Sequence, residues 1–551
     1  MLDSMLMVVP YSGYLSIVKL VVYLLFLFVA FPVLRWIYED AKAIGADERF
    51  WTSILLGTFM ISVIIWWIVP IYIVGIMVYI AVFGGISLAY VRYRNSRVLD
   101  FDKILTPDHI ASLFKRGEEE NDALESFVFV TSNKNEVPRP QPRTKDFFGY
   151  RATYDLLREA IARRAEMIKM ISAGEHYTVT FDVDGVSDKQ PDIPKDQMEY
   201  LIHFVKHLGD LDANEHRKPQ KSKFRTQQGK DIREWEIQTA GSTKGENIHI
   251  KPAGKEAIKR VSEIGFESDQ LNLLEQIRSK KKGIVLITGP KGSGLTTTFY
   301  ACIREHDAYT NNIHTLEGEV TGVVPSVTQE VFRLSDTAGS TYAQKLEHLI
   351  RMGPDIVGVA ECRHAETAKV IVNAAGNQLV YVVLEADSAL KALGLWLKMI
   401  GDRKLAVQHL NAVCCQRLLR KLCDECKQGY APNQDLLKKF NLPADKAKVL
   451  YRPGKVVYDK RNRESTCPIC MGTGYLGRTA IFEMAGINDD LRQVIQKAEN
   501  LQDIGSHLRR AKMLYLQEQA LRKVLAGNTS INEMIRVLTA PKEAKAKKSN
   551  T

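Results

Sequence analysis

The sequence predicts an α/β domain built on a mostly parallel sheet, preceded by an α+β domain and by membrane helices at the N-terminus. Three observations lead to this prediction. A glycine-rich phosphate-binding loop follows a buried apolar strand, strands and helices alternate from Gly265 onward, and long apolar segments occupy the first 90 residues. The chain has 551 residues, of which 45% are hydrophobic and 25% charged, so it is long enough for three or four domains.

The formal net charge of +11 suits three classes of protein: one that binds nucleic acid, one that lies on an anionic membrane surface, and a cytoplasmic domain next to a membrane. The apolar N-terminal segments favour a membrane. The sequence shows no basic motif with interleaved aromatic residues, which single-strand binders use. We therefore expect no nucleic-acid partner, and a DNA-handling basic protein stays as an alternative.

Two apolar runs predict the membrane anchor. Tyr14 to Leu34 is almost uniformly apolar, and Ile54 to Ala89 is a longer run divided by Pro70. About 20 apolar residues span a bilayer, so the longer run exceeds one crossing. We predict an anchor over residues 1–97 with about three transmembrane helices, at 14–34, 52–69 and 71–90. A re-entrant hairpin is the alternative for the second run.

Basic residues predict the topology of the anchor. They lie after the first apolar run and after the last one: Arg35, Lys42, Arg49, Arg92, Arg94 and Arg97. Lys and Arg are in excess on the cytoplasmic side of membrane proteins. Three spans with the N-terminus outside would place both clusters, and everything after residue 90, in the cytoplasm.

The soluble part divides into four predicted segments: a linker with a small helical segment at 98–146, an α+β domain at 147–255, a phosphate-loop domain at 256–540, and a basic disordered tail at 541–551. The α+β domain shows helical spacing from Tyr150 and a strand ending in an Asp-Gly turn at Gly185. After about Val407 the pattern is mainly helical, except around the cysteines at 414–480.

The phosphate loop reads Gly-Pro-Lys-Gly-Ser-Gly-Leu-Thr-Thr-Thr from Gly289 to Thr298. Its backbone N–H groups and the helix that follows are suited to cradling phosphates. Leu295 stands where the motif requires a lysine that reaches the β- and γ-phosphates. Thr296 stands where a hydroxyl would bind Mg²⁺, and Lys291 is expected to point outward. The nucleotide-contacting candidates are Gly289, Pro290, Lys291, Gly292, Ser293, Gly294, Leu295, Thr296 and Thr297.

A second motif, from Pro354 to Ala368, is an apolar strand that ends in Glu361. A carboxylate at that place can orient Mg²⁺ or polarise the attacking water. The alternative is that Glu361 serves only as a cap or an ion-pair partner.

With both motifs present, the chain resembles the type II secretion and type IV pilus assembly ATPase family, as a divergent member with a degenerate phosphate loop. Gly289 to Thr298 match the family's loop except at Lys291 and Leu295, and Gly353 to Ala368 is similar to its second motif. The resemblance covers roughly residues 150–540. It implies a RecA-like P-loop fold, and a homo- or hetero-hexamer that binds ATP and Mg²⁺ between protomers.

The resemblance also implies roles for single residues. Glu361, Glu317, Arg363 and Arg217 fall on catalytic positions. Arg217 lies in a segment, residues 214–220, that resembles one projecting basic side chains toward a neighbouring subunit's nucleotide. The departures from the family concentrate at the chemistry: only Glu317 survives in register in the aspartate box, and Gln378 and Glu385 replace both histidines of the histidine box.

Two C-x-x-C pairs predict a metal site. Cys423 and Cys426 form one pair, and Cys467 and Cys470 form the other. Four thiolates so paired are typical of a closed tetrahedral zinc site with a structural or docking role, within an insertion at 414–480. A redox pair or free thiols are the alternative, and cobalt or iron can occupy the same sulfurs. We expect Cys414 and Cys415, on a helical run, to be core thiols.

These features together predict a membrane-anchored scaffold of the family at the bacterial inner membrane, multi-pass, with its soluble domains facing the cytoplasm. It would bind ATP, hydrolyse it weakly or not at all, and act in pilus or pseudopilus assembly or in protein export. The expected partners are inner-membrane platform proteins and a catalytic paralogue. The first alternative is an active ATPase motor that recruits Lys291 or Arg217 in place of the missing lysine.

Overall fold

The computed structural model describes residues 17–68, 72–98, 103–106, 127–141, 144–254, 257–333, 339–443, 447–454, 456–458, 464–511 and 513–539. The chain divides into two compact units, Met1–Gly254 and Lys255–Thr551, and each is described by itself. The predicted tail at 541–551 lies outside the described residues, as do residues 107–126 of the predicted linker.

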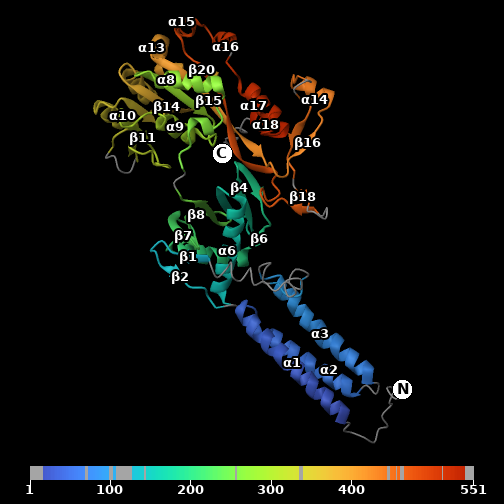
Figure 1. Cartoon of the computed structure of the whole chain (residues 1–551). Coiled ribbons are helices and arrows are strands. Elements are labelled where there is room, and N and C mark those ends of the chain that lie inside the picture. Colours follow the sequence, from blue (N-terminus) through green and yellow to red (C-terminus); the bar gives the residue numbers. More distant parts are fainter. Residues whose placement is uncertain are drawn as a thin grey trace, which may run out of the picture. The chain divides into compact units, whose positions relative to one another are not determined.

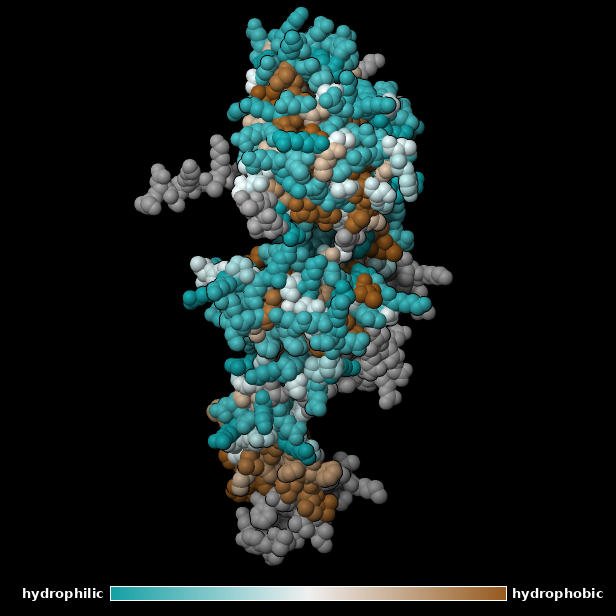
Figure 2. Space-filling view, turned by 90° about the vertical axis from the view of Figure 1, so that its left-hand side faces the viewer, coloured by the Kyte–Doolittle hydropathy of each residue, from teal (hydrophilic) through white to brown (hydrophobic). Residues whose placement is uncertain are grey.

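Three helices occupy the predicted anchor: α1 (Ile17–Ala43), α2 (Glu48–Ile68) and α3 (Tyr72–Asn95) (Figure 1). Among the described residues, two stretches are long and apolar enough to cross a membrane, Glu48–Ile65 in α2 and Ile76–Asn95 in α3. The expectation of three spans is therefore met only in part. Figure 2 shows the hydrophobic surface of these helices, which includes exposed Phe28, Phe31 and Ile68.

One charged pair is buried where α1 and α3 meet. Arg94 Nε lies 2.9 Å from Asp40 Oδ2, and the Tyr90 hydroxyl donates to the same oxygen at 2.8 Å. Trp36 and Trp51 pack edge-on against Tyr90. Arg94 was expected among the basic residues that set the topology, but its charge is offset inside the bundle. The exposed charge at this end of the helices is therefore smaller than the sequence suggests.

The α+β domain of the first unit is one sheet in the strand order β2-β1-β7-β8-β9-β3-β4-β5, with β6 beside β4. Its strands are β1 (Phe127–Val130), β2 (Glu136–Val137), β3 (Met167–Ser172), β4 (His176–Val183), β5 (Val186–Lys189), β6 (Ile193–Pro194), β7 (Gln220–Gln228), β8 (Asp231–Ser242) and β9 (Gly245–Pro252). Helices α6 (Lys145–Arg163) and α7 (Lys195–Leu208) share its hydrophobic core. The predicted α+β character is confirmed.

The start of this domain differs from the prediction. Residues 127–137 were assigned to a linker, but β1 pairs antiparallel with β7 and carries buried Phe127 and Phe129 into the core. The two phenylalanines alternate with outward residues, which is the pattern of a half-buried strand. Four residues within a polar stretch are too short for that pattern to stand out in the sequence.

The second unit is built on a sheet in the order β12-β11-β13-β14-β10-β15-β20. The strands are β10 (Gly283–Gly289), β11 (Ile313–Glu317), β12 (Thr328–Val331), β13 (Ile356–Val359), β14 (Leu379–Glu385), β15 (Leu410–Leu422) and β20 (Tyr475–Gly486). All neighbouring pairs are parallel except β15 and β20. The predicted, mostly parallel sheet is confirmed.

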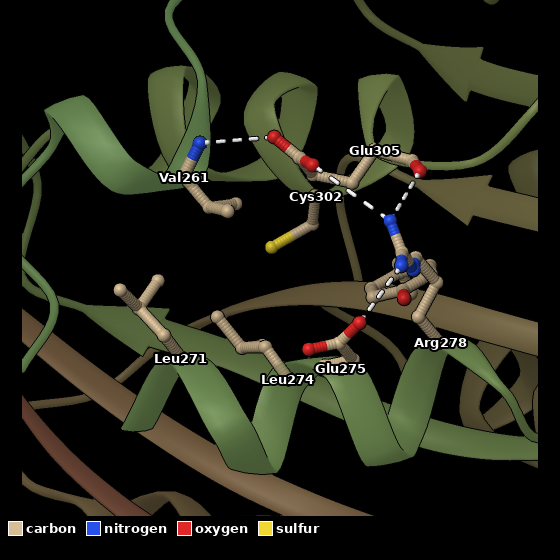
Figure 3. Close-up of a pocket in the computed structure, with 8 residues that line it drawn as sticks. Val261, Leu271, Leu274, Glu275, Arg278, Cys302 and Glu305 are labelled. Atoms are coloured by element: carbon tan, nitrogen blue, oxygen red, sulfur yellow. Dashed lines mark hydrogen bonds and ion pairs between the residues drawn. The ribbon is translucent and has the colours of Figure 1, made fainter. Parts of the chain in front are cut away.

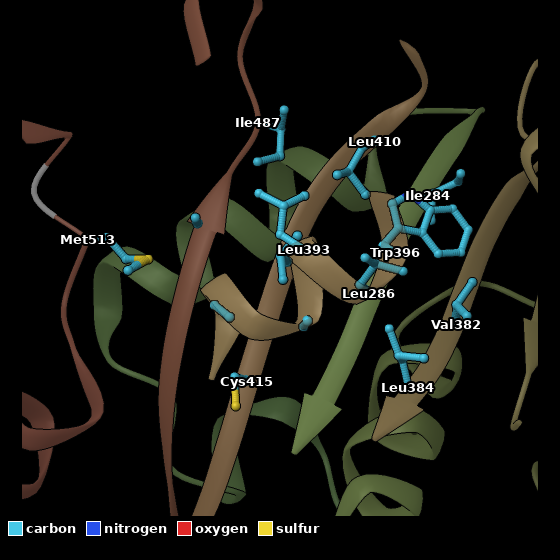
Figure 4. Close-up of a cluster of buried hydrophobic side chains, with 14 of the residues drawn as sticks. Ile284, Leu286, Val382, Leu384, Leu393, Trp396, Leu410, Cys415, Ile487 and Met513 are labelled. Carbon is cyan, nitrogen blue, oxygen red and sulfur yellow. The ribbon is translucent and has the colours of Figure 1, made fainter. Parts of the chain in front are cut away.

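Helices cover both faces of this sheet: α8 (Ser268–Arg278), α9 (Leu295–Arg304), α10 (Tyr342–Arg351), α11 (Ala365–Ala374), α12 (Ala389–Ile400), α13 (Arg403–Gln408), α15 (Asp489–Lys497), α16 (Leu501–Arg510), α17 (Leu516–Leu525) and α18 (Ile531–Leu538). Alternate residues of β10 enter different cores. Ile284 and Leu286 join the larger cluster, with Trp396 (Figure 4), while Val285 and Ile287 join the other. A strand buried on both faces reads as a continuous apolar run, which is how β10 was recognised.

The C-terminal half of this unit corrects the sequence analysis. Residues after Val407 were expected to be mainly helical outside the cysteine region, with a helical run around Cys414 and Cys415. The structure has the long antiparallel strands β15 and β20 there, which extend the sheet. Cys414 and Cys415 lie on β15 rather than on a helix, and both are buried core thiols as expected. Periodicity alone cannot separate an apolar strand from a buried helix, which explains the error.

An ion-pair cluster fastens α18 to β15. The buried carboxylate of Glu533 lies 2.8 Å from Arg420 Nη2 and 2.6 Å from Arg536 Nη2. Burial alone would raise the pKa of Glu533, but hydrogen bonds from Arg536 and Arg420 outweigh it and lower the pKa to about 2. Glu533 also accepts the backbone N–H of Arg420 at 3.0 Å. The ion pairs with Arg420 and Arg536 therefore form only while Glu533 is ionised.

The Glu533 cluster predicts a pH dependence of stability. Because the folded pKa is lowered from 4.5 to about 2, the contribution of Glu533 is complete above pH 4.5 and is lost as the pH falls toward 2. Glu533→Gln should lower the free energy of unfolding at pH 7 by about 3 kcal/mol and should flatten this acid limb. Urea unfolding at several pH values measures both effects. Glu499→Gln, at an exposed position, is the control; equal losses in the two variants would contradict the prediction.

Candidate nucleotide site

The carboxyl ends of the parallel strands bring the predicted site residues to one edge of the sheet. Gly289, the last residue of β10, pairs in register with Glu385, the last residue of β14. The backbone of Cys362, just after Glu361, donates to Val383 of β14 at 3.1 Å. Open α/β sheets bind ligands at this edge. The two motifs found in the sequence therefore converge in the structure.

The phosphate loop has the backbone geometry of an anion cradle. Gly292 and Gly294 have φ of +77° and +85°, which residues with a side chain rarely adopt. A side chain at Gly289 would collide with Ser293 Oγ and with the carbonyl of Gln416, so the strand must end in glycine. Helix α9 begins at Leu295, and its N-cap, Gly294, supplies no side-chain hydrogen bond. Its first N–H groups therefore face the loop without intrahelical acceptors.

Gln416 braces the loop from the neighbouring strand. Its Nε2 donates to the Ser293 carbonyl at 2.8 Å, and its side chain is buried. Among the described residues, Ser293 Oγ and Gln416 Oε1 are buried and have no hydrogen-bond partner. The role of Gln416 has no signal in the sequence, because only the pairing of β15 with β10 brings it to the loop.

Leu295 is part of the apolar packing beside the loop. It is partly buried against the cluster that contains Phe299 and Ile287. Its Cδ2 lies 3.3 Å from the position that a Cβ on Gly289 would take. Leu418 Cδ1 likewise lies 3.3 Å from the position of a Cβ on Gly294. Lys291 is exposed, as expected for a side chain that points outward. Hydrocarbon therefore lines the side of the cradle from which a lysine would reach terminal phosphates.

The two predicted carboxylates have different surroundings. Glu361 is partly exposed, lies 3.2 Å from Arg363, and extends toward Gly318. Glu317 is 1% exposed and accepts hydrogen bonds from Thr315 at 2.7 Å, from Gln329 at 3.0 Å, and from the Tyr300 hydroxyl. Burial, together with Glu317, raises the pKa of Tyr300. Glu361 thus faces the open edge, while Glu317 belongs to a buried side-chain network.

Gln378 and Glu385, which replace the two histidines, also differ in burial and in position. Gln378 is buried just before β14, and its Nε2 donates to the Ile350 carbonyl at 3.3 Å. Glu385 is exposed at the end of β14, opposite Gly289. At these two described positions the structure therefore has a buried amide and an exposed carboxylate, and the carboxylate lies at the strand end that pairs with Gly289.

Arg217 lies in the first unit, on an exposed loop between α7 and β7. Glu215 Oε1 accepts the backbone N–H groups of Arg217 and Lys218 at 2.8 and 3.1 Å. The fully buried Lys206 donates to the Glu215 carbonyl and pairs with Glu246, both at 2.8 Å. These contacts fix the backbone of the loop while the Arg217 side chain stays exposed.

A separate pocket of about 260 Å³ lies at the other end of α9 (Figure 3). Leu271, Leu274 and Cys302 face its interior, and Arg278 connects Glu275 with Glu305 at one side. Burial raises the pKa of the Cys302 thiol to about 12, so the thiol is protonated and unreactive at neutral pH. The residues of the phosphate loop do not line this pocket.

The four predicted metal ligands come together. The Sγ atoms of Cys423, Cys426, Cys467 and Cys470 all lie within 4.8 Å of one another and are buried. Cys423 and Cys467 are 3.9 Å apart, and Cys426 and Cys470 are 3.6 Å apart. Tetrahedral zinc with Zn–S bonds of about 2.3 Å requires sulfur separations of about 3.8 Å. The Gly474 N–H donates to Cys470 Sγ at 3.2 Å, as suits a thiolate. The cluster fits a closed zinc site.

The sequence of the chain is similar to those of known secretion-system proteins. The sequence model of the family "Type II/IV secretion system protein" matches residues 146–536. Type II secretion system protein E of Pectobacterium carotovorum is 30% identical over 384 residues, which cover 69% of this chain and 74% of that protein. The type IV pilus assembly ATPase PilB of Thermus thermophilus is 28% identical over 404 residues, which cover 73% of this chain but 44% of that protein.

Among solved structures, the X-ray structure of the Legionella pneumophila ATPase DotB aligns with a TM-score of 0.49 and 15% identity. The alignment covers 73% of this chain and 96% of that one.

The cysteine cluster predicts a metal-dependent stability. Cys470→Ser should remove bound zinc, because a hydroxyl replaces one of the four thiolates, and should lower the melting temperature. Elemental analysis and thermal unfolding measure the two effects. Cys302→Ser, at a buried thiol outside the cluster, is the control and should keep the metal. A wild-type chain purified without any metal would contradict the prediction.

Proposed function

Because the chain belongs to the Type II/IV secretion system protein family, we propose that it is a membrane-anchored, nucleotide-binding scaffold in type II secretion or type IV pilus assembly, and that its ATP hydrolysis is weak or absent. The observation that carries the proposal is Leu295 at the start of α9. The backbone of the cradle is complete around it, but the cation that offsets charge on the transferring phosphate is missing.

The missing charge is large enough to decide the activity. Removing one preorganised contact to the developing charge typically costs about 3 kcal/mol of barrier, or roughly a hundredfold in rate. Among the described residues, the charged side chains of the two motifs and of the end of β14 do not replace it. Lys291 is exposed, Arg363 is paired with Glu361, and Glu385 adds negative charge beside the loop.

The proposed cofactors follow from the same geometry. ATP would lie on the loop N–H groups, with Mg²⁺ near the exposed Thr296 and near Glu361. Zinc would be held by the four cysteines and would stabilise the end of the β15–β20 pair, because Cys423 follows β15 and Cys470 precedes β20. A four-sulfur site leaves no open position, so its role is structural or in docking.

The proposed assembly is a homo- or hetero-hexameric ring at the bacterial inner membrane, in contact with platform proteins and with a catalytic paralogue. The anchor is proposed from α2 and α3, each of which holds a stretch long and apolar enough to cross a membrane among the described residues. Exposed apolar side chains on α1, α2 and α3 add to it, among them Phe28, Phe31, Ile68, Met77 and Ile80 (Figure 2). The soluble domains would face the cytoplasm, since Arg92 lies in the last turn of α3 and Arg97 follows the helix.

Two other functions are distinguishable from this one. An active motor would have to bring in Lys291, or Arg217 from a neighbouring subunit, as the missing cation. A DNA-handling protein would exploit the net charge of +11. A salt-sensitive gel shift with duplex or single-stranded DNA would favour the latter, and no shift at low salt would exclude it.

The proposal predicts a specific order of activities. The wild-type chain should release phosphate from ATP at the background rate, and Leu295→Lys should raise this rate by about a hundredfold, because it restores the contact to the terminal phosphate. Glu361→Gln in the Leu295→Lys background should abolish the gain. Robust phosphate release by the wild-type chain, lost on Glu361→Gln alone, would instead establish the active motor.

The anchor predicts membrane behaviour. The full chain expressed in bacteria should stay with the membrane pellet after an alkaline carbonate wash, because α2 and α3 bury apolar surface in the bilayer. Changing Ile61, Ile64 and Ile80 together to lysine should weaken this retention, since these side chains are exposed on the helices. Complete release of the wild-type chain by the wash would contradict the anchor.

A further inference from the structure

We propose that the phosphate loop binds nucleoside diphosphates in preference to triphosphates. This inference rests on the proposed nucleotide-binding role and specifies the ligand of the same site. It follows from an asymmetry within the cradle: the groups that would hold the inner phosphates are in place, while those around the terminal phosphate oppose it.

The inner part of the cradle is equipped for an anion. Helix α9 has 10 residues, and its N-terminus meets the turn formed by Gly292 and Gly294. The N–H groups there are neutral donors that bind phosphate oxygens without a side-chain cation. Ser293 is 5% exposed, and its Oγ, which lies against Gly289, has no partner among the described residues. A buried hydroxyl in that state is a donor available to a ligand.

The outer part of the cradle is apolar where a terminal phosphate needs charge. The motif's lysine serves the β- and γ-phosphates, and Leu295 takes its place. The leucine packs over Gly289, with its Cδ2 3.3 Å from the position of a Cβ there. A phosphate oxygen placed against this side chain would lose hydration and gain no hydrogen bond.

Negative charge adds a second penalty for the terminal phosphate. Glu385 is exposed at the strand end that pairs with Gly289, and Glu361 is partly exposed at the end of the neighbouring strand. Arg363 offsets part of the charge of Glu361, at 3.2 Å, but no described contact offsets Glu385. A triphosphate brings one more phosphate charge than a diphosphate toward these carboxylates, and like charges at short range repel.

The discrimination therefore comes from the terminal phosphate alone, because the loop N–H groups and Ser293 treat the inner phosphates of both nucleotides alike. In a ring, a scaffold with this preference would hold a diphosphate, as a subunit does after hydrolysis, whichever nucleotide its neighbours bind. Its occupancy would therefore depend on the concentration of the diphosphate more than on that of the triphosphate.

Titration calorimetry of the full chain in detergent tests the preference, with ADP and with ATP, each in Mg²⁺ and in EDTA. In EDTA, where no Mg²⁺ lies between the phosphates and Glu361, we expect ADP to bind about tenfold more tightly than ATP, the factor that a difference of about 1.4 kcal/mol produces. Mg²⁺ should reduce this preference without removing it, because the cation screens the carboxylates. Leu295→Lys should reverse the order, because an ammonium would meet the terminal phosphate. ATP binding as tightly as ADP, or a Leu295→Lys chain with an unchanged ratio, would overturn the inference.

A matched control distinguishes the effect of adding a positive charge from the effect of its position in the cradle. Leu405→Lys adds the same charge at an exposed leucine of α13, outside the cradle, and should leave the ratio of the two affinities unchanged. A ratio that shifts equally in both lysine variants would overturn the inference, while the nucleotide-binding role would stand. If the wild-type chain bound neither nucleotide, the proposed function would fall together with the preference.

Discussion

The structure of the site depends on the burial of β10 between β14 and β15. Its side chains enter one core on each face of the sheet, so the strand cannot shift or rotate without opening both. The place where β10 ends is thereby fixed, and so is the turn into α9. Parallel pairing then aligns Gly289 with the ends of its neighbours, whichever side chains those ends carry.

This constraint explains how a nucleotide cradle can persist without its cation. The turn is held by glycine backbone geometry, by the close approach of Ser293 to Gly289, and by the hydrogen bond from Gln416. None of these contacts involves the side chain at 295. A leucine there packs against neighbouring apolar side chains, and it avoids the cost of placing an ammonium beside them. The backbone conformation of the loop therefore does not depend on the lysine that phosphate transfer requires.

The parts that could be predicted from the sequence are those with a local signature. The run from Gly283 to Gly289, the carboxylate at Glu361 and the paired cysteines each carry their spacing within a few residues. The brace by Gln416 could not be predicted, because it depends on which strand lies beside β10. The helical expectation for Cys414 and Cys415, and the linker assigned to Phe127 and Phe129, failed for a related reason: both segments become strands only through partners distant in the sequence.

The cradle is proposed to hold nucleotide without cleaving it. Single-turnover chase of labelled ATP, with the purified wild-type chain in excess, tests this claim most directly, because every bound nucleotide is then followed to its fate. We expect the bound label to be recovered as ATP over many minutes. Conversion to ADP within seconds, by a chain free of any sister subunit, would contradict it.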